Sequence, residues 1–261
     1  MTHRSYSQKS QYLDCGWKYK LSRIDNVPET PGVWFPGGSA VHATLEALEK
    51  REVGTADGPQ YFLDDFNRRV IELHQIEPDE SKWMIAGRAS KQWPLKENIP
   101  WWLYNGQSMI KDYINWRAGL EAGGWKLAYI NGVPAVEIET TGMIGKIEVK
   151  AFVDVVLEDP SEVLVPIDYK TGTREPGPEQ LGLYSVLLER LFKRPVTWGA
   201  YYMARKGGLT EMHDLSRFTE ENLAYQFETL DRAIEAQIFI PHVTPMCSTC
   251  SVNRYCEFYQ K

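Results

Sequence analysis

The sequence lacks long hydrophobic runs, an excess of positive charge and a secretory leader. No stretch of 18 or more apolar residues occurs, and the N-terminal sequence MTHRSYSQKSQYLDC has no apolar core, so we expect neither a membrane span nor a signal peptide. The net charge of −6 argues against a passive basic coat on nucleic acid, although metal ions and local basic patches can still meet phosphates. We expect a single soluble, cytoplasmic domain spanning residues 1–261.

Cysteine is also scarce, and its few positions are informative. Cys247, Cys250 and Cys256 form a C-x2-C-x5-C group near the end of the chain, and Cys15 is the only other cysteine. In a reducing cytosol such a group favours a metal centre over disulfides, and four thiolates complete a site for an iron–sulfur cluster or zinc. Four free thiols are the alternative, and spacing alone does not separate iron–sulfur from zinc.

The most informative stretch is a hairpin pattern that contains two acids and a lysine. Strand-like runs at residues 151–157 and 163–170 flank a turn rich in turn-forming residues. Asp154 lies in the first run, and the second run ends in Asp168 and Lys170. Side chains alternate along a strand, so Asp168 and Lys170 share a face, and the hairpin can bring Asp154 beside them.

Two further polar residues follow the hairpin. A helix is expected over residues 179–191, and Gln180 and Tyr184 are four apart near its start, so they lie on one face of it. Adjacent carboxylates are costly unless a cation holds them together, and divalent cations prefer carboxylate oxygens. A lysine beside such a metal can orient a water and offset charge on a phosphate. The group therefore predicts phosphodiester hydrolysis, with an ordinary surface Asp168–Lys170 pair as the alternative.

The remaining pattern predicts an α/β fold with a central mixed β-sheet flanked by helices. One basic, aromatic-rich helix is expected over 6–24, where rings and cations suit either single-stranded DNA or ordinary packing, and another is expected to begin at Ser39 as N-cap with His42 in its first turn. A hairpin is expected at Asn131-Gly132, followed by Glu137 on a strand face. Other expected elements are helices at 61–75, 101–120 and 219–238 and strands at 196–205 and 209–215.

These residues resemble the PD-(D/E)XK nuclease superfamily, in its RecB-like branch. The resemblance places Asp154 as the first acid and Asp168-x-Lys170 as the acid–lysine pair. It is carried further by Gln180-x-x-x-Tyr184 and Gly38-x-x-x-His42, with Glu137 as a possible additional acid. Pro166 stands two residues before Asp168 and not at the motif's usual place.

The resemblance implies a catalytic metal site. His42, Asp154, Asp168 and the main-chain carbonyl of Tyr169 are expected to bind Mg²⁺ or Mn²⁺. Lys170 is expected to position or activate the attacking water. Gln180 and Tyr184 are expected to hold the DNA and the lysine in place.

The cysteine arrangement resembles a narrower group of these nucleases. One cysteine before the core and C-x2-C-x5-C after it resembles the CRISPR-associated RecB-like family, the fourth Cas family, and the AddB nuclease domain. The resemblance implies a 4Fe-4S cluster that joins Cys15 to the region 245–261, with zinc as the alternative. Residues 55–120 would be a helical insert.

The leading hypothesis is therefore a metal-dependent DNA exonuclease. Its substrate would be DNA that is single-stranded or has free ends, in recombination, repair, phage DNA metabolism or CRISPR adaptation, with protein partners from a recombination or CRISPR complex and no membrane. The alternative is a non-catalytic DNA-binding or assembly module with a structural metal centre. A third reading, electron transfer through the cluster, leaves the acids and the lysine unused.

Overall fold

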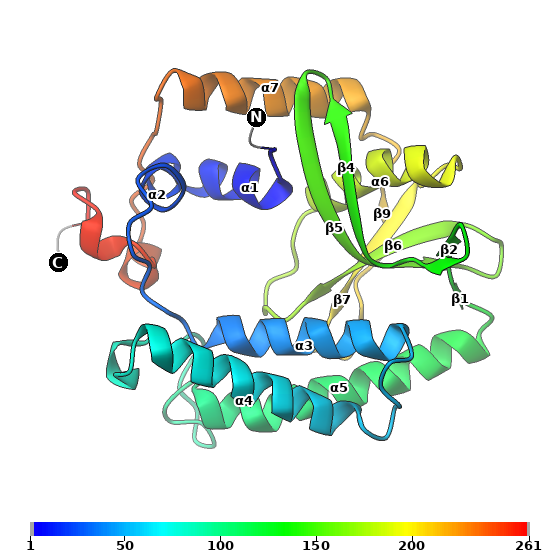
Figure 1. The fold of residues 1–261 in the computed structure, drawn as a ribbon, viewed down its shortest axis with the longest axis horizontal. Coiled ribbons are helices and arrows are strands. Elements are labelled where there is room, and N and C mark those ends of the chain that lie inside the picture. The colour runs from blue at the N-terminus through cyan, green and yellow to red at the C-terminus, as the bar shows by residue number, and fades with distance from the viewer. Residues whose placement is uncertain (1–2, 260–261) are drawn as a thin grey trace.

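The computed structural model describes residues 3–259, which form a mixed β-sheet between two layers of helices (Figure 1). The α-helices are α1 (Tyr6–Asp14), α2 (Gly16–Tyr19), α3 (Trp34–Glu49), α4 (Gly58–Ile76), α5 (Ile99–Ala122), α6 (Glu179–Phe192) and α7 (Glu220–Glu235). The strands are β1 (Lys126–Leu127), β2 (Tyr129–Ile130), β3 (Val133–Pro134), β4 (Val136–Ile144), β5 (Ile147–Glu158), β6 (Leu164–Lys170), β7 (Trp198–Met203), β8 (Gly208–Leu209) and β9 (His213–Asp214). A π-helical turn covers Lys20–Ile24, and short 3₁₀ turns cover Glu80–Lys82, Pro245–Thr249 and Asn253–Tyr255.

The main sheet is mixed, as its sequence pattern predicts. Its strand order is β1-β5-β6-β7-β8, with β4 also paired to β5 and β9 to β7. The β6–β7 pair is parallel and the other pairs are antiparallel. The parallel pair requires a crossover connection, and α6 supplies it. The crossover carries α6 back across the sheet from the carboxyl end of β6, where the predicted acid and lysine lie.

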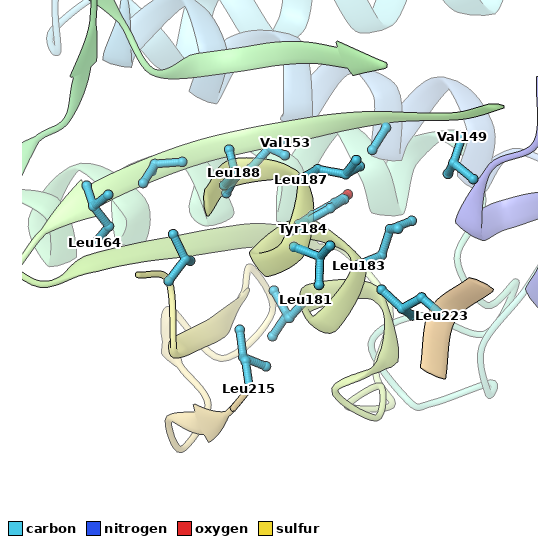
Figure 2. Packing of buried hydrophobic residues seen from close by; sticks show 14 of the residues in the cluster. Val149, Val153, Leu164, Leu181, Leu183, Tyr184, Leu187, Leu188, Leu215 and Leu223 are labelled. Atoms are coloured by element: carbon cyan, nitrogen blue, oxygen red, sulfur yellow. The ribbon is translucent and has the colours of Figure 1, made fainter. Parts of the chain in front are cut away.

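Each face of the sheet has its own hydrophobic core. On one face α6 and α7 cover the sheet, and Figure 2 shows Leu183, Tyr184 and Leu187 of α6 packed against Val149 and Val153 of β5. On the other face, buried residues of α3, α4 and α5 pack against β5, β6 and β7. The region expected as a helical insert therefore supplies two of the three helices of this second layer (Figure 1).

The hairpin of β5 and β6 forms where the pattern predicts it. Asp159 begins the turn, and its Oδ1 accepts hydrogen bonds from the backbone N–H groups of Ser161 at 2.9 Å and Val163 at 2.8 Å. β6 is buried on both faces up to Tyr169, which explains its nearly continuous apolar sequence. β5 is longer than the predicted strand because its N-terminal half pairs with β4.

The prediction of one helix over residues 6–24 is wrong, because the chain breaks at Cys15. This residue is extended, with φ −164° and ψ 107°, and it separates α1 from α2. The Sγ atom of Cys15 accepts a hydrogen bond from the Lys18 N–H at 3.4 Å and so caps the second helix. A π-helical turn then completes the segment.

The prediction that Ser39 begins a helix is also wrong. α3 begins at Trp34, so Ser39 lies inside the helix and His42 lies beyond its first turn. Pro36 is compatible with this start because proline is tolerated in the first turn of a helix. Two adjacent glycines, Gly37 and Gly38, look like a break in the sequence, but both lie within the helix.

Most other predicted elements are present with shifted ends, but the single strand expected at 209–215 is wrong, because that segment forms two short strands, β8 and β9. Asn131 and Gly132 form the two-residue turn between β2 and β3 with φ values of 51° and 82°. Thr219 caps α7 by accepting a hydrogen bond from the Asn222 N–H at 3.3 Å. Among residues 3–259, no helix is both long and apolar enough to cross a membrane.

Candidate active site

The two predicted aspartates lie on neighbouring strands at the point where those strands separate. The ladder between β5 and β6 ends at the pair Val155–Ile167, so Asp154 and Asp168 lie one step beyond it. Asp154 Oδ2 there accepts a hydrogen bond from the Tyr169 backbone N–H at 2.6 Å. Asp168 is 2% exposed and Asp154 is 9% exposed, so both carboxylates are withdrawn from water. The hairpin thus brings two buried acids together.

Asp168 is the centre of a hydrogen-bonded group that includes the predicted lysine, glutamine and tyrosine. Gln180 Nε2 donates to Asp168 Oδ1 at 2.8 Å, and the Tyr184 hydroxyl donates to the same oxygen at 3.0 Å. Lys170 Nζ donates to Gln180 Oε1 at 2.9 Å and forms an ion pair with Asp168 Oδ2. The structure therefore brings all four side chains together at the start of α6.

His42 approaches the acids from the opposite helical layer. Its Nδ1 lies 3.2 Å from Asp154 Oδ1, and α3 carries it to this place. Burial lowers the pKa of His42, but the charge of Asp154 and the hydrogen bond to it outweigh burial, so the pKa is raised. The family resemblance indicated His42 as a member of the site, and the structure has it beside Asp154, although the predicted start of the helix was wrong.

Glu137 lies on β4 across from Asp154. The pairs Val136–Val155 and Ile138–Val153 flank the two acids, and Glu137 has a positive φ of 49°. Burial, followed by the charges of Asp154 and Glu46, raises the pKa of Glu137 to about 7. The predicted additional acid is therefore close enough to the other carboxylates to feel their charge.

Burial and neighbouring negative charges disfavour the ionised form of the carboxyl groups at this site. Burial raises the pKa of Asp168; the charge of Lys170 opposes this shift and that of Asp154 adds to it, and the net shift is upward. Asp168 Oδ2 is buried and, among residues 3–259, accepts no hydrogen bond beyond its ion pair with Lys170. Gathered carboxylates with raised pKa values are stabilised by a bound cation.

The donor set fits a divalent cation chemically. Carboxylate oxygens of Asp154 and Asp168 are the ligands that Mg²⁺ or Mn²⁺ prefers, whereas the imidazole nitrogen of His42 is a softer donor that transition metals accept more readily than Mg²⁺ does. Within the part of the chain that the structure describes, no group of three or more histidine, cysteine, aspartate or glutamate side chains is arranged so that it could hold a metal ion. The predicted metal site, including the carbonyl of Tyr169, therefore stays a prediction.

A buried polar network behind the site was not predicted from the sequence. The Tyr113 hydroxyl donates to Glu49 at 2.7 Å and lies 2.6 Å from the Tyr169 hydroxyl, which is therefore the donor between the two. Arg117 Nε donates to the same Glu49 oxygen at 2.8 Å. This network ties β6 to α3 and α5 directly behind Asp168. Its members are scattered along the sequence without a common spacing, so no local pattern predicts it.

Arg205 is a second supporting residue that the sequence did not indicate. Its guanidinium binds both carboxylate oxygens of Glu97, at 2.7 and 2.8 Å, and its Nε donates to the Thr171 carbonyl. Thr171 directly follows Lys170, so this contact fixes the chain where it leaves the site. Buried bidentate pairs of this kind are among the stronger polar contacts in proteins.

The four cysteines converge at a second place, remote in sequence from the acids. All four line one small cavity, of about 30 Å³, between α2 and the C-terminal turns. The N–H groups of His242 and Thr244 donate to Cys15 Sγ and Cys247 Sγ, each at 3.4 Å. Burial raises the pKa of Cys250. Thiolates are ligands for an iron–sulfur cluster or zinc, but among residues 3–259 the four side chains are not arranged so that they could hold a metal ion, so the cluster stays a prediction.

Comparison with known proteins identifies the family of this chain. The chain belongs to the PD-(D/E)XK nuclease superfamily, whose family model matches residues 3–257. It is similar to the Gene 69 protein of Mycobacterium phage D29, with 29% identity over 279 aligned positions that cover 98% of this chain and 97% of that protein. The Gene 69 protein of Mycobacterium phage L5 is 28% identical over 286 positions, with the same coverage.

A solved structure shares the fold. The crystal structure of a protein from Eubacterium rectale, presumed to be an exonuclease, superposes with a TM-score of 0.52 and 10% identity. The match covers 99% of this chain and 90% of that protein. The comparisons confirm the predicted superfamily and the mixed α/β fold. The finer assignment to a RecB-like branch with an iron–sulfur cluster stays a prediction.

Proposed function

We propose that this nuclease is a divalent-metal-dependent DNA exonuclease that acts on single strands or free ends. The observation that carries the proposal is the hydrogen-bonded group of Asp168, Lys170, Gln180 and Tyr184 beside Asp154 and His42. Two buried acids and a lysine at one end of a sheet are the parts that phosphodiester hydrolysis needs. Membership in a nuclease superfamily supports the same reading.

Each residue has a role that follows from its contacts. Asp154 and Asp168, with His42, would hold Mg²⁺ or Mn²⁺, which supplies Lewis-acid polarisation of the phosphate when bound. Lys170, held at 2.9 Å from Gln180, orients the attacking water and offsets charge on the phosphate. Gln180 and Tyr184 position Lys170 and Asp168 relative to each other.

The finer points of the proposal have weaker but independent support. The structural neighbour from Eubacterium rectale, presumed to be an exonuclease, favours attack from DNA ends. The two phage relatives favour a setting in phage DNA metabolism or recombination over CRISPR adaptation. We also propose that Cys15, Cys247, Cys250 and Cys256 hold a 4Fe-4S cluster, because all four line one cavity.

A cleavage assay with a lysine variant tests the function. The protein would be purified anaerobically and incubated with end-labelled single strands and Mn²⁺ or Mg²⁺. Lys170→Ala should lower kcat by a factor on the order of 10² to 10⁴, because it removes a charge and a proton-transfer group at the reacting phosphate. DNA binding by this variant should persist.

Controls distinguish the specific effect of removing Lys170 from the effect of removing any lysine. Lys206→Ala changes an exposed lysine in the turn after β7 and should cleave like the wild type. EDTA should stop cleavage by the wild type and by Lys206→Ala. Wild-type cleavage rates in Lys170→Ala would refute the role of the lysine. No metal-dependent degradation by the wild type, together with intact DNA binding, would favour the non-catalytic module instead.

A further inference from the structure

A cleft of about 320 Å³ opens directly from the catalytic group. One wall is Gln180 and Tyr184 of α6, and another is Lys150 and Phe152 of β5. The remaining wall is the N-terminal segment from His3 to Gln8, with Arg23 from the π-helical turn. Its volume lies at the lower end of the range of about 300–1,000 Å³ for ligand sites, which suits a small unit such as one nucleotide.

The cleft is continuous with the candidate active site. Gln180 and Tyr184 line it while they also donate hydrogen bonds to Asp168. Phe152 precedes Asp154 by two residues on β5, so their Cα atoms are roughly 7 Å apart. Burial and then the charges of Glu179, Asp14 and Asp168 raise the pKa of Tyr6, which places this ring within the field of the acid. A molecule in the cleft would therefore adjoin the scissile phosphate.

The chemistry of the cleft suits a nucleotide. Phe152 is 46% exposed although it is a large apolar side chain on a central strand, and Lys150 Nζ lies 4.9 Å from the centre of its ring. Arg23 supplies a second cation. Within the described range 3–259, no aspartate or glutamate lines the cleft, although the chain has a net charge of −6. An exposed ring beside cations is the arrangement that binds bases and phosphates of unpaired strands.

Three acids that do not line the cleft lie near it and must be weighed, namely Glu139, Glu179 and Asp14. Glu139 faces Phe152 across the β4–β5 ladder and pairs with Lys150 at 2.7 Å, but the glutamate side chain is 58% exposed. Exposed pairs of this kind contribute little, about 0–1 kcal/mol, so a phosphate can take the place of Glu139. Glu179 lies near Tyr6 at the first turn of α6.

The N-terminal wall is held in place before any ligand arrives. The Arg4 N–H donates to the Glu148 carbonyl and the Lys150 N–H donates to the Arg4 carbonyl, both at 2.8 Å. The Arg4 side chain reaches α7, where its Nε donates to Asp231 Oδ1 at 2.8 Å. A wall anchored at both its backbone and its side chain makes the cleft a preformed site.

We propose that this cleft binds one nucleotide of an unpaired DNA strand next to the scissile phosphate. The base stacks on Phe152, and the phosphate lies between Lys150 and Arg23. The inference rests on the proposed nuclease function, and it names the feature that selects single strands. A base inside a duplex cannot present its face to Phe152, because its stacked neighbours already cover both faces.

The first test measures DNA binding without cleavage. Fluorescence anisotropy in EDTA, or with Ca²⁺ if binding needs a cation, gives the affinity for a labelled single-stranded oligonucleotide. Phe152→Ala should bind roughly 5- to 150-fold more weakly, the effect of losing one base–ring stack. Phe152→Trp should bind as tightly as the wild type. Tyr225→Ala removes a ring that is 71% exposed on α7 and away from the cleft, and it should have no effect.

An abasic substrate identifies the stacked base. An oligonucleotide that lacks the base at the cleft position should lose about the same affinity for the wild type as Phe152→Ala loses for the intact strand. Combining both changes should cost no more than either alone, because they remove the same contact. Moving the abasic position along the oligonucleotide, one nucleotide at a time, identifies the base that stacks on Phe152. If no position shows this non-additivity, the stacking assignment is overturned.

Salt dependence tests the cations. Lys150→Ala should reduce the slope of log Kd against log salt by about 0.7, the value for one phosphate contact on a single strand, and Arg23→Ala should do the same. Lys111→Ala, an exposed lysine on α5, should leave the slope unchanged. Equal slopes in all variants would overturn the phosphate contacts.

Failure of this inference can be told from failure of the proposed function. Wild-type cleavage with unchanged single-strand binding by Phe152→Ala would overturn the cleft and leave the nuclease standing. Weakened binding by Phe152→Ala in a protein that never cleaves would support the cleft and remove the enzyme. A wild type that binds no single strand in EDTA or with Ca²⁺ would overturn the inference. If Phe152→Ala lost equal affinity for duplex and for single-stranded DNA, the cleft would not be the feature that selects single strands.

Discussion

At the scale of single residues, the site gathers more acid than its cations balance. The charge of Asp154 acts on both Glu137 and Asp168, and among the described residues Lys170 is ion-paired with Asp168 alone. Burial and neighbouring acids raise the pKa of Glu137 to about 7 from its ordinary value of 4.5. In the metal-free protein this glutamate is therefore a source of pH-dependent instability.

Glu137→Gln should remove that instability. A group that binds a proton more tightly when folded contributes stability below its unfolded pKa, and this contribution is lost as the pH rises through the folded pKa. The wild type in EDTA should therefore lose stability between pH 4.5 and about 7, and the variant should lose less. Urea unfolding at pH 5 and pH 8 measures the difference.

The exposed neighbour Glu139 provides the control for this experiment. Glu139→Gln should leave the pH dependence of the unfolding midpoint as it is in the wild type. If Glu137→Gln shows the same drop between pH 5 and pH 8 as the wild type, the raised pKa is not the cause of the pH dependence.

Single residues were also what the sequence predicted best. Asp168, Lys170, Gln180 and Tyr184 form one hydrogen-bonded group because strand and helix periodicity place them on facing surfaces over a short stretch. His42 is far away in sequence, and only its resemblance to a nuclease motif indicated it. The supporting residues Glu49 and Arg117 had neither a local period nor a motif, so their pairing emerged only from the fold.

At the scale of elements, the start of α3 shows why local rules failed. Gly37 and Gly38 resemble a helix break, yet the helix runs through them. A Cβ atom on Gly37 would lie 2.2 Å from the ring of Trp102, which is 1% exposed on α5. The first glycine is therefore a packing residue that lets two helices approach, and a tertiary contact of this kind is not visible to the local rule that predicted a helix start at Ser39.

The two glycines should respond differently to alanine. Gly37→Ala should lower the free energy of unfolding by about 1–3 kcal/mol, because the Trp102 ring is enclosed and has to move. At Gly38 the nearest atom to an added Cβ is the Thr171 hydroxyl at 3.1 Å, and that side chain can rotate. Gly38→Ala should be neutral or stabilise the helix by up to about 1 kcal/mol.

Urea unfolding of the two variants side by side checks this difference. Each variant is the control for the other, since both add one methyl group to the same helix. Equal loss of stability in both would show that α3 tolerates no side chain at either position. In that case the contact with Trp102 would not explain Gly37.

Elsewhere, residues that commonly end strands and helices predicted the element boundaries correctly. Gly172 and Pro178 separate β6 from α6, and both elements lie within a residue of their predicted ends. Cys15 divides the first helix because its sulfur caps α2 and faces the C-terminal turns. A break caused by a contact with residues at the other end of the chain has no local sequence cause.

At the scale of the whole molecule, cysteines from two distant parts of the chain lie around one cavity. Cys15 and Cys247 line one cavity although more than 200 residues separate them. A covalent link that closes so long a loop stabilises a fold by on the order of 5 kcal/mol in the chain-entropy picture. Four ligands to one cluster would act as such a link.

Removing one ligand should loosen the ends and leave the sheet intact. Cys250→Ser, prepared anaerobically, should lose visible absorption and iron and should unfold at a lower urea concentration than the wild type. Ser248→Ala, an exposed change between two of the cysteines, should retain both. Zinc in place of iron would keep the stability effect and remove the colour. Full stability of Cys250→Ser would contradict the proposed link.

The anchoring of Arg4 has a consequence for synthesis on the ribosome. Its backbone pairs with the strand at Glu148 and Lys150, and its guanidinium binds Asp231 of α7. On the ribosome, this segment therefore cannot take its place until Asp231 has also emerged. A chain cut short before α7 would lack this tie, so the N-terminal wall of the cleft would be incomplete.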